Sequence, residues 1–551
     1  MAQPVASPGP RDMQGYPTAA ADRRWVILVV VAIAQLMVVL DSTIVNIALP
    51  SAQQALGFAD NERQWVVTGY ALAFGSLLLV GGRLGDMYSR KWVFITGLIG
   101  FAVASAIGGA AVSVEMLVAA RAMQGAFGSI LAPSALGTLV STFRDPLERG
   151  RAFAVFGSVA VGGGAVGLIL GGVLTQYLSW RYTLFINLIF AAIAVAGALA
   201  YIGNGRPAQP PRMDWPGAVL ACSGLFLIVF GFSHAETAGW TATPTLGSLI
   251  LGVVLLIAFV AAEQRSSHPL LPLRVILDRT RAGSYAAVGV TGIATFGIFL
   301  FLTYYMQQVK GYSPLTTGML FLPLVVGILV ASTSYSALPR LGPRPLMTAG
   351  MLLGAGGTAY LAQLTVASSY LGGVLPALLI MGLGFGMIFA PAVNTATAGV
   401  PRQDSGVASA LVNTIQQVGG SIGISILSAI AASATTRYLT GGHAGQQASA
   451  IAATNGYTAA FTISAALLVI GAILAILMLP SQKRLAELTS EAPAPPILLP
   501  EPEVAAPVLL PQDQVSSTRH PAVKVMPVGL LCCSPVIDPG LPPATARPSS
   551  S

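Results

Sequence analysis

The first long apolar run of the chain spans Trp25–Leu49 and reads WVILVVVAIAQLMVVLDSTIVNIAL. About 20 such residues suffice for a helix to cross the hydrocarbon core of a bilayer, and Asp41 is the one charged side chain in this run. Arg23 and Arg24 precede the run, as basic residues precede the hydrophobic region of a signal peptide. The run is too long for such a region, however, and it contains a carboxylate. We therefore expect a retained transmembrane helix.

Thirteen further apolar runs follow the first, so the sequence predicts fourteen transmembrane helices. None of the runs shows the strict alternation of polar and apolar residues that is typical of a barrel strand. Hydrophobic residues make up 54% of the 551 residues and charged residues only 9%, whereas about a quarter of a soluble protein is charged. The composition excludes an ordinary soluble protein and indicates an all-α integral membrane protein.

Basic residues are distributed unequally between the two sides of the predicted membrane. When Arg23 and Arg24 are placed in the cytoplasm, nineteen loop Lys and Arg residues lie on the inner side, and the outer loops hold only Arg63, Arg181, Lys310 and Arg437. Because positive loop charges are retained in the cytoplasm, both termini are predicted to be cytoplasmic and the number of helices even. The net charge of +8 is thus explained by orientation rather than by nucleic-acid binding, which would need a basic stripe.

A faint internal repeat predicts the domain organisation. The loop Gly82–Lys91, GRLGDMYSRK, follows the second predicted helix, and Pro339–Arg344, PRLGPR, follows the tenth. Two six-helix bundles with two helices inserted between them would place both loops at the same position of their repeats. The predicted segments are a disordered cytoplasmic tail (1–24), a six-helix bundle (25–203), two inserted helices with flanking loops (204–282), a second six-helix bundle (283–479) and a Pro-rich disordered cytoplasmic tail (480–551).

Several motifs resemble those of one transporter family. The loop Gly82–Lys91 resembles the signature loop of the major facilitator superfamily, from which Met87 and Ser89 depart. Further stretches are similar to signatures of its fourteen-helix drug:proton antiporter branch, namely Leu40–Pro50, Arg121–Gly125, Trp180–Asn187, Glu263 and Pro269–Arg274. The resemblance covers about Trp25 to Leu479 and implies a monomeric exporter of lipophilic compounds that is driven by inward proton flow.

Asp41 and Arg121 are the only charged side chains within the fourteen predicted spans. A charge in mid-membrane costs at least about 2.5 kcal/mol, so such a residue indicates a function. Both residues are predicted to lie at a similar depth, and Gln124 lies on the same helical face as Arg121. Burial favours a neutral carboxyl group while an arginine favours the carboxylate, which makes protonation switchable. We expect the pair to couple proton flow to transport; the alternative is a static pair that only fixes packing.

The loop between the second and third predicted helices is interpreted as a gating loop, with Gly82, Asp86, Arg90 and Lys91 as its working residues. A carboxylate at this place can cap a helix or pair with a neighbouring helix, and so latch one conformation. The alternative is that these charges only orient the chain in the membrane.

The fifth predicted helix is rich in glycine. Gly163, Gly167, Gly171 and Gly172 resemble the antiporter signature of the family, although Leu168 stands where that signature has proline. Glycines at this spacing allow close helix packing and soften a helix for rocking movements. Ordinary small-residue packing is the alternative.

Polar and aromatic residues of the predicted spans are candidates for a substrate cavity. They are Gln124, Asn46, Tyr304, Tyr305, Phe385, Asn394, Asn413 and Gln416. For each of them, an ordinary contact between helices is the alternative.

Other chemistries have no signal in the sequence. The cysteines Cys222, Cys532 and Cys533 have neither a disulfide framework nor metal-ligand spacing, and no Walker-type run indicates ATP as the driver. We expect no metal and no cofactor, with the proton-motive force as the energy source. The expected partners are the lipid bilayer, protons and a small lipophilic substrate, without nucleic acid, for a monomeric multi-pass protein of the bacterial inner membrane.

Three functions compete at this stage. The first is a proton-coupled exporter of lipophilic drugs or antibiotics, and the second is an exporter dedicated to one endogenous secondary metabolite. The third, from a different class, is a non-transporting membrane sensor or enzyme. That third function would need a soluble domain or an intramembrane cluster of His, Cys and Asp residues, and the sequence has no sign of either.

Overall fold

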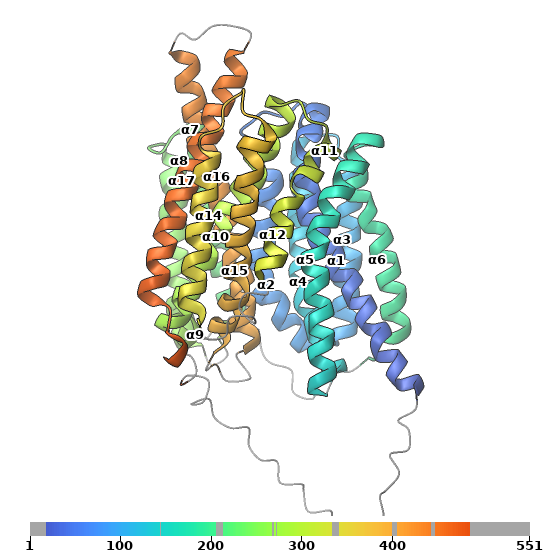
Figure 1. Ribbon diagram of the computed structural model, residues 1–551. Helices are drawn as coiled ribbons and strands as arrows, with labels where there is room; N and C mark the ends of the chain where they lie inside the picture. Colours follow the sequence, from blue (N-terminus) through green and yellow to red (C-terminus); the bar gives the residue numbers. More distant parts are fainter. Residues whose placement is uncertain are drawn as a thin grey trace, which may run out of the picture. The chain divides into compact units, whose positions relative to one another are not determined.

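The computed structural model describes residues 18–143, 145–204, 213–266, 269–271, 273–332, 341–398, 400, 405–441, 447–484 and 487 (Figure 1). All regular elements within these residues are helices, without a single strand. Thirteen of these helices are long and apolar enough to cross a membrane. The prediction of an all-α membrane protein is therefore confirmed.

The first part of the chain forms eight long helices. They are α1 (Thr18–Leu56), α2 (Arg63–Met87), α3 (Arg90–Gly109), α4 (Val114–Thr142), α5 (Pro146–Tyr177), α6 (Tyr182–Tyr201), α7 (Trp215–Ala238) and α8 (Thr243–Arg265).

The second part contains shorter and interrupted elements as well. They are α9 (Leu273–Ile276), α10 (Arg279–Tyr304), the π-helix η1 (Tyr305–Val309), α11 (Pro314–Leu320), α12 (Leu322–Ser332), α14 (Pro343–Leu361), the π-helix η2 (Tyr370–Val374), α15 (Leu375–Thr397), α16 (Ser405–Thr440) and α17 (Ala448–Met478).

Helix starts follow the expected capping chemistry. The carboxylate of Asp145 accepts hydrogen bonds from the backbone N–H groups of Leu147 and Glu148 at the start of α5, where Pro146 is the first helical residue. Asp278 caps α10 in the same way. At these two helices a short polar side chain thus ends the loop and fixes where the apolar run becomes helical.

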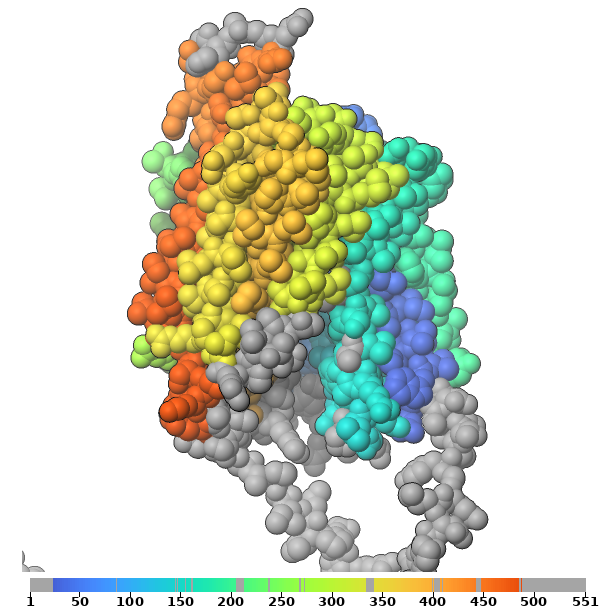
Figure 2. Space-filling model, in the orientation of Figure 1, coloured from blue at the N-terminus to red at the C-terminus, as the bar shows by residue number. Residues whose placement is uncertain are grey.

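The helices pack mainly with neighbours from the same part of the chain. In the first part α4 packs on α2 and α3, while α1 packs on α5 and α6. In the second part α10 packs on α16 and α17, and α14 and α12 pack on α15. Contacts of α2 with α16 and of α5 with α11 join the two sets of helices, and Figure 2 shows α5 (teal) beside the yellow helices of the second part.

Three details differ from the sequence prediction. The tenth predicted span, 316–338, is divided at Phe321 into α11 and α12, and its last residues lie outside the described part of the chain. The short helix α9 was not expected. The helix α14, which covers the eleventh predicted span, is 19 residues long and is not among the thirteen apolar helices. Its first three residues, Pro343, Arg344 and Pro345, lower its hydropathy, and its four glycines add little.

Both ends of the helical unit lie on the same side. In Figure 1, α1 begins and α17 ends at the lower end of the bundle. Residues up to Pro493 form one unit and Ala494–Ser551 a second, and the second lies entirely outside the described residues. The predicted disorder of the two tails, residues 1–24 and 480–551, concerns mostly residues outside the described part, but it is wrong for residues 18–24, which form the start of α1.

Candidate functional site

Asp41 and Arg121, predicted as a pair, are in direct contact. Nη1 of Arg121 lies 2.5 Å from Oδ2 of Asp41, and the two side chains are 2% and 0% exposed, respectively. Asp41 is contributed by α1 and Arg121 by α4, 80 residues later in the chain. The structure thus holds an ion pair that is fully removed from solvent.

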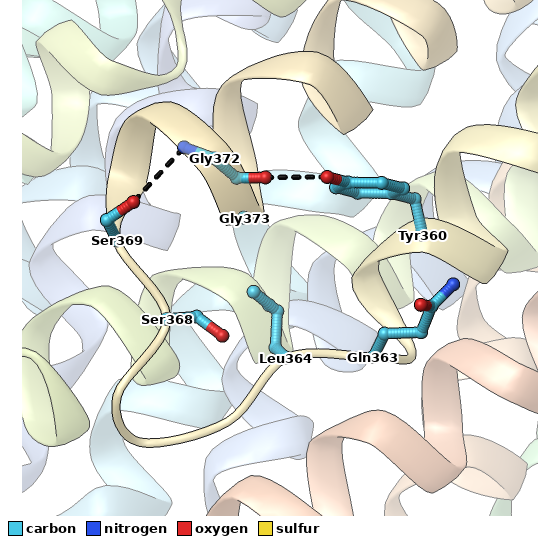
Figure 3. A pocket seen from close by; sticks show the side chains of 7 residues that line it. All are labelled: Tyr360, Gln363, Leu364, Ser368, Ser369, Gly372 and Gly373. Atoms are coloured by element: carbon cyan, nitrogen blue, oxygen red, sulfur yellow. Dashed lines mark hydrogen bonds between the residues drawn. The ribbon is translucent and has the colours of Figure 1, made fainter.

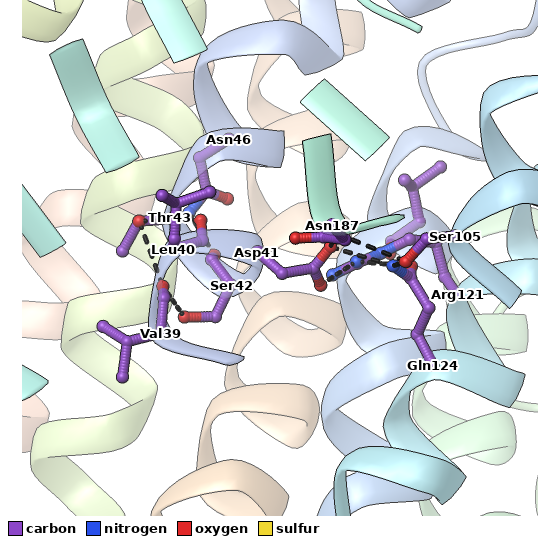
Figure 4. A network of polar contacts seen from close by, with 11 residues as sticks. Val39, Leu40, Asp41, Ser42, Thr43, Asn46, Ser105, Arg121, Gln124 and Asn187 are labelled. Atoms are coloured by element: carbon purple, nitrogen blue, oxygen red, sulfur yellow. Dashed lines mark hydrogen bonds and ion pairs between the residues drawn. The ribbon is translucent and has the colours of Figure 1, made fainter. Parts of the chain in front are cut away.

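Neutral side chains donate hydrogen bonds to the other oxygen of the Asp41 carboxylate (Figure 4). Oδ1 of Asp41 accepts hydrogen bonds from Nε2 of Gln124 at 2.9 Å and from Nδ2 of Asn187 at 2.7 Å. Both amides also donate to Oγ of Ser105, at 2.7 and 3.3 Å. Asp41 is therefore bonded to side chains from α4 and α6, and through them to α3, which makes its charge the centre of a network across four helices.

The Arg121 guanidinium is held from two further directions. Its Nε donates to the backbone carbonyl of Val66 on α2 at 3.2 Å, and its Nη1 donates to Oε1 of Gln124 at 2.8 Å. The guanidinium carbon also lies 4.4 Å from the centroid of the Tyr70 ring, a cation–π geometry. Arg121 is thereby connected to α1, α2 and its own helix at once.

Glycine brings α2 close enough for these contacts. A Cβ atom at Gly125, four residues after Arg121, would overlap the carbonyl oxygen of Tyr70. One turn further, a Cβ at Gly128 would lie 3.1 Å from the Phe74 ring. The Arg121–Gly125–Gly128 face of α4 therefore combines a charged group with two positions of close approach.

The sequence analysis did not assign Ser105, Asn187 or Tyr70 to this site. All three are buried. Asn187 had a usable signal, because it is an amide inside an apolar span and ends a stretch that resembles a family signature. Ser105 and Tyr70 had none, since serine and tyrosine are common in membrane helices and only the packing shows what they contact.

The network can exist in two charge states. With Asp41 ionised, a carboxylate and a guanidinium neutralise each other, and both carboxylate oxygens have donors. A proton on Asp41 would leave the positive charge of Arg121 without a counter-charge in a buried place, which weakens their attraction.

The opposite side of α1 carries other polar groups. Ser42, Thr43 and Asn46 point away from the Arg121 side in Figure 4. Ser42 and Thr43 bond to backbone carbonyls of their own helix, and so does Asn46, whose Nδ2 lies 3.2 Å from the carbonyl oxygen of Ser42. Asn46, a predicted cavity residue, is half-buried. α1 therefore separates the ion pair from a second polar face.

The remaining cavity candidates do not gather around one point. Gln124 belongs to the Asp41 network, whereas Tyr304 ends α10 and Tyr305 begins η1. Phe385 is buried, with its ring 3.0 Å from where a Cβ of Gly354 on α14 would lie.

Three other candidates are placed on the second set of helices. Asn394 on α15 and Asn413 on α16 are exposed, whereas Gln416 is half-buried.

The predicted glycines of α5 allow close contact with two helices, α1 and α11. Cβ atoms at Gly163 and Gly171 would lie 3.1 and 2.8 Å from side chains of α1, and one at Gly167 would overlap Thr43. Gly172 faces α11 instead, where a Cβ would lie 2.5 Å from Cα of Leu315. α5 runs unbroken through Leu168, the residue that replaces the expected proline.

The predicted gating loop is anchored to its own set of helices. Gly82 lies within α2, Nη1 of Arg90 donates to the carbonyl of Gly137 at 3.3 Å, and Nζ of Lys91 donates to that of Leu199 at 2.8 Å. The side chain of Asp86 lies outside the described part of the structure. Arg83 reaches further, because its Nη2 donates to the carbonyl of Pro269 at 2.7 Å.

A pocket of about 240 Å³ lies between the end of α14 and η2 (Figure 3). The Tyr360 hydroxyl donates to the Gly372 carbonyl at 2.7 Å across it, and the other lining residues are Gln363, Leu364, Ser368, Ser369 and Gly373. None of the predicted site residues lines this pocket. Elsewhere in the described residues, no group of three His, Cys, Asp or Glu side chains is placed to hold a metal ion.

Known proteins are similar to this chain in sequence. The family model described as Major Facilitator Superfamily matches residues 31–424. The puromycin resistance protein of Streptomyces alboniger is 45% identical over 478 residues, which are 86% of this chain and 95% of that protein. The cephamycin export protein of Amycolatopsis lactamdurans is 39% identical over 423 residues, which are 74% and 85% of the two chains.

Solved structures agree in fold. A bacterial homologue of the human lysosomal transporter Spinster, in an inward-facing and unoccupied conformation, superposes with a TM-score of 0.58 at 14% identity. The match covers 86% of this chain and 99% of that one. At this identity the likeness concerns the fold alone.

Proposed function

Since the chain belongs to the major facilitator superfamily and is a multi-pass membrane transporter, we propose that it exports lipophilic drugs or antibiotics in exchange for protons. The observation that carries this proposal is the buried Asp41–Arg121 pair. Burying an ion pair in a membrane costs free energy, so such a pair indicates a function. Binding a proton from the membrane gradient is a function that needs a buried carboxylate. The names of the two relatives support an antibiotic as the cargo.

The proposal includes the membrane arrangement. We assign fourteen membrane helices to the bacterial inner membrane, with α14 as the one that composition alone does not identify, and we place the lower end of Figure 1 in the cytoplasm together with both termini. Residues 25–203 and 283–479 would form the two bundles, and 204–282 the inserted pair α7 and α8. The transporter would act as a monomer, without cofactor or metal and without nucleic acid, on the proton-motive force alone.

In the proposed cycle, Asp41 takes a proton from the outside and later releases it to the less acidic cytoplasm. Protonation removes the charge that holds Arg121, so the helices that they connect change their relative position. One proton entering down 100 mV and one pH unit supplies about 3.7 kcal/mol, enough for a few-hundredfold gradient of a neutral substrate.

The decisive experiment replaces Asp41 by Asn, which keeps the size and hydrogen bonding of the side chain but cannot titrate. Reconstituted Asp41→Asn protein should equilibrate a substrate across a vesicle membrane but not concentrate it under an imposed proton gradient, because binding no longer depends on protons. Glu115→Gln, a change of an exposed carboxylate in the first turn of α4 and outside the ion pair, is the matched control and should concentrate substrate normally. If Asp41→Asn still accumulates substrate uphill, the coupling role is wrong and the pair is static.

An exporter dedicated to one endogenous metabolite is the second candidate. It is favoured by the relative that is named for cephamycin export. Efflux assays against a chemically diverse panel separate the two, since a dedicated exporter would confer resistance to one compound class only.

A further inference from the structure

The side chain of Arg63 inserts between two tyrosine rings at the upper end of the bundle. Its guanidinium carbon lies 4.3 Å from the ring centroid of Tyr304 and 5.9 Å from that of Tyr457. Arg63 is the first residue of α2, while the rings belong to α10 and α17 of the other set of helices. All three residues are buried. A cation from one half of the molecule is thus enclosed by aromatic rings of the other half.

A hydrogen bond connects Tyr304 to α1, and a second one continues from there to Asp60. The Tyr304 hydroxyl donates to Oε1 of Gln53 at 2.7 Å, and Nε2 of Gln53 donates to Oδ1 of Asp60 at 2.8 Å. Asp60 also pairs with Arg63 at 3.5 Å, but its side chain is 76% exposed. An ion pair with one exposed partner contributes little, so the two rings are the main partners of the guanidinium.

Two more hydrogen bonds cross between the halves at this end. Nε2 of Gln307 donates to the carbonyl of Ile47 at 3.0 Å, and the backbone N–H of Leu315 donates to Oε1 of Gln176 at 3.3 Å. Both involve neutral groups, so of these cross-half contacts only the one through Arg63 carries a formal charge. Separation of the halves here would require the Arg63 guanidinium to leave its rings.

The helix α2 also connects Arg63 to the proposed proton site. Val66, whose carbonyl accepts from Nε of Arg121, follows Arg63 by three residues and therefore lies on the same face of α2, less than one turn away. Tyr70, under the Arg121 guanidinium, lies one further turn along the helix. A shift of Arg121 would therefore move the very end of α2 that carries Arg63.

We infer that Arg63, enclosed by Tyr304 and Tyr457, closes the outer end of the transporter, and that Arg121 transmits the charge state of Asp41 to this closure through α2. The inference rests on the proposed function for its proton-linked part, because it takes Asp41 as the protonated group. Arg63 acts as a positioning residue that sets how long the outer end stays shut.

Distances between spin labels test the closure directly. Cys222, Cys532 and Cys533 are first replaced by Ser, and labels are then placed on exposed leucines, at Leu178 and Leu371 for the outer end and at Leu147 and Leu341 for the inner end. The protein without further changes should show mainly the short outer distance. Arg63→Gln should raise the ratio of long to short outer distances about 5- to 30-fold, which corresponds to about 1 to 2 kcal/mol of lost cation–π attraction. Arg437→Gln, a change of an exposed outer arginine, should leave both distances as they are.

The tyrosine side provides an independent variant if Arg63→Gln does not fold. Tyr304→Leu removes the ring and should open the outer end as Arg63→Gln does. Tyr304→Phe keeps the ring and loses only the bond to Gln53, so it should restore the short distance. Equal behaviour of the Leu and Phe variants, or an unchanged outer distance in Arg63→Gln, overturns the closing role of the cation–π contact.

Asp41→Asn in the same labelled protein tests the transmission. It mimics the neutral carboxyl group, which in the proposed cycle passes from the outward-open to the inward-open state, so the fraction with the long outer distance should fall without any change of pH. If the outer distances of Asp41→Asn are unchanged while those of Arg63→Gln shift clearly, Arg63 still closes the outer end, but its connection to Asp41 is overturned. None of these readouts uses uphill transport, so a failure of the proposed proton coupling would be seen separately.

Discussion

The two halves of the molecule bury polar groups in different ways. Around Asp41, side chains from α1, α3, α4 and α6 bond to one another, and the bonds cross from helix to helix. In the second half, buried hydroxyls such as those of Thr291, Thr358 and Ser421 bond to the carbonyl four residues earlier in their own helix. The first half is thus held by a network centred on a charge, whereas a buried bond between helices of the second half, from the Tyr285 hydroxyl to the Ala408 carbonyl at 3.2 Å, joins neutral groups.

Close glycine packing also holds helices of the second half together. A Cβ at Gly384 on α15 would lie 2.5 Å from the carbonyl oxygen of Gly350 on α14, and one at Gly419 on α16 would lie 2.6 Å from that of Gly289 on α10. Such contacts depend on shape and not on ionisation. We therefore expect a proton on Asp41 to rearrange the first half directly, with the second half moving as a packed body.

The largest effect that this comparison predicts comes from Arg121→Met, which leaves a buried carboxylate without its cation. We expect uphill transport to be lost and the free energy of unfolding to fall by about 3–5 kcal/mol. Unfolding in mixed micelles and transport by the reconstituted protein measure the two effects. Stability within about 1 kcal/mol of the unmodified protein would show that the pair is not an essential contact of the first half.

Asn187→Ala is expected to have the second largest effect. The change removes one donor to ionised Asp41 and one to Ser105, so the free energy of unfolding should fall by about 1.5–3 kcal/mol. Asn455→Ala, which alters an exposed amide on α17, is the control and should have almost no effect. Equal stability of the two variants would contradict the idea that polar bonds hold the first half together.

Gly384→Ala tests the packing of the second half. The added methyl group would collide with the backbone of α14, so a loss of about 1–3 kcal/mol is expected from overpacking. Gly356→Ala on α14 is the matched control, because a Cβ there would meet nothing within 4 Å. Both are measured by the same unfolding assay. A tolerated Gly384→Ala would mean that the contact adjusts easily, against a shape-determined second half.

Thr291→Val should have the smallest effect. It removes a hydroxyl that bonds only within α10, at 2.8 Å from the Ala287 carbonyl, and keeps the branched shape. A loss of about 0.6 kcal/mol or less is expected. Ser105→Ala, which deprives two amides of their acceptor, should cost more. The reverse order in an unfolding titration would remove the distinction between the halves.

The sequence was sufficient to choose Asp41 and Arg121, because charges inside apolar spans are rare and each has to be explained. It was not sufficient for Arg63, which we placed in an outer loop and counted only for its charge. In the structure Arg63 begins α2 and is buried between rings that lie some 240 and 390 residues later in the chain. Sequence spacing contains no information about such a contact, since it exists only when the two halves are packed against each other.

The sequence by itself determined the helical membrane fold, the family and the two central charges. Hydrophobic length, loop charge and rare buried charges are local properties, and a membrane restricts what they can form to helices. The tertiary structure alone decided that Ser105, Asn187 and Tyr70 complete the site, that Phe385 faces α14, and that α11 and α12 divide one predicted span. Each of these depends on which side chains of distant helices meet, and packing decides that. In the sequence, a serine, tyrosine or glycine looks the same whether it contacts a partner or lipid.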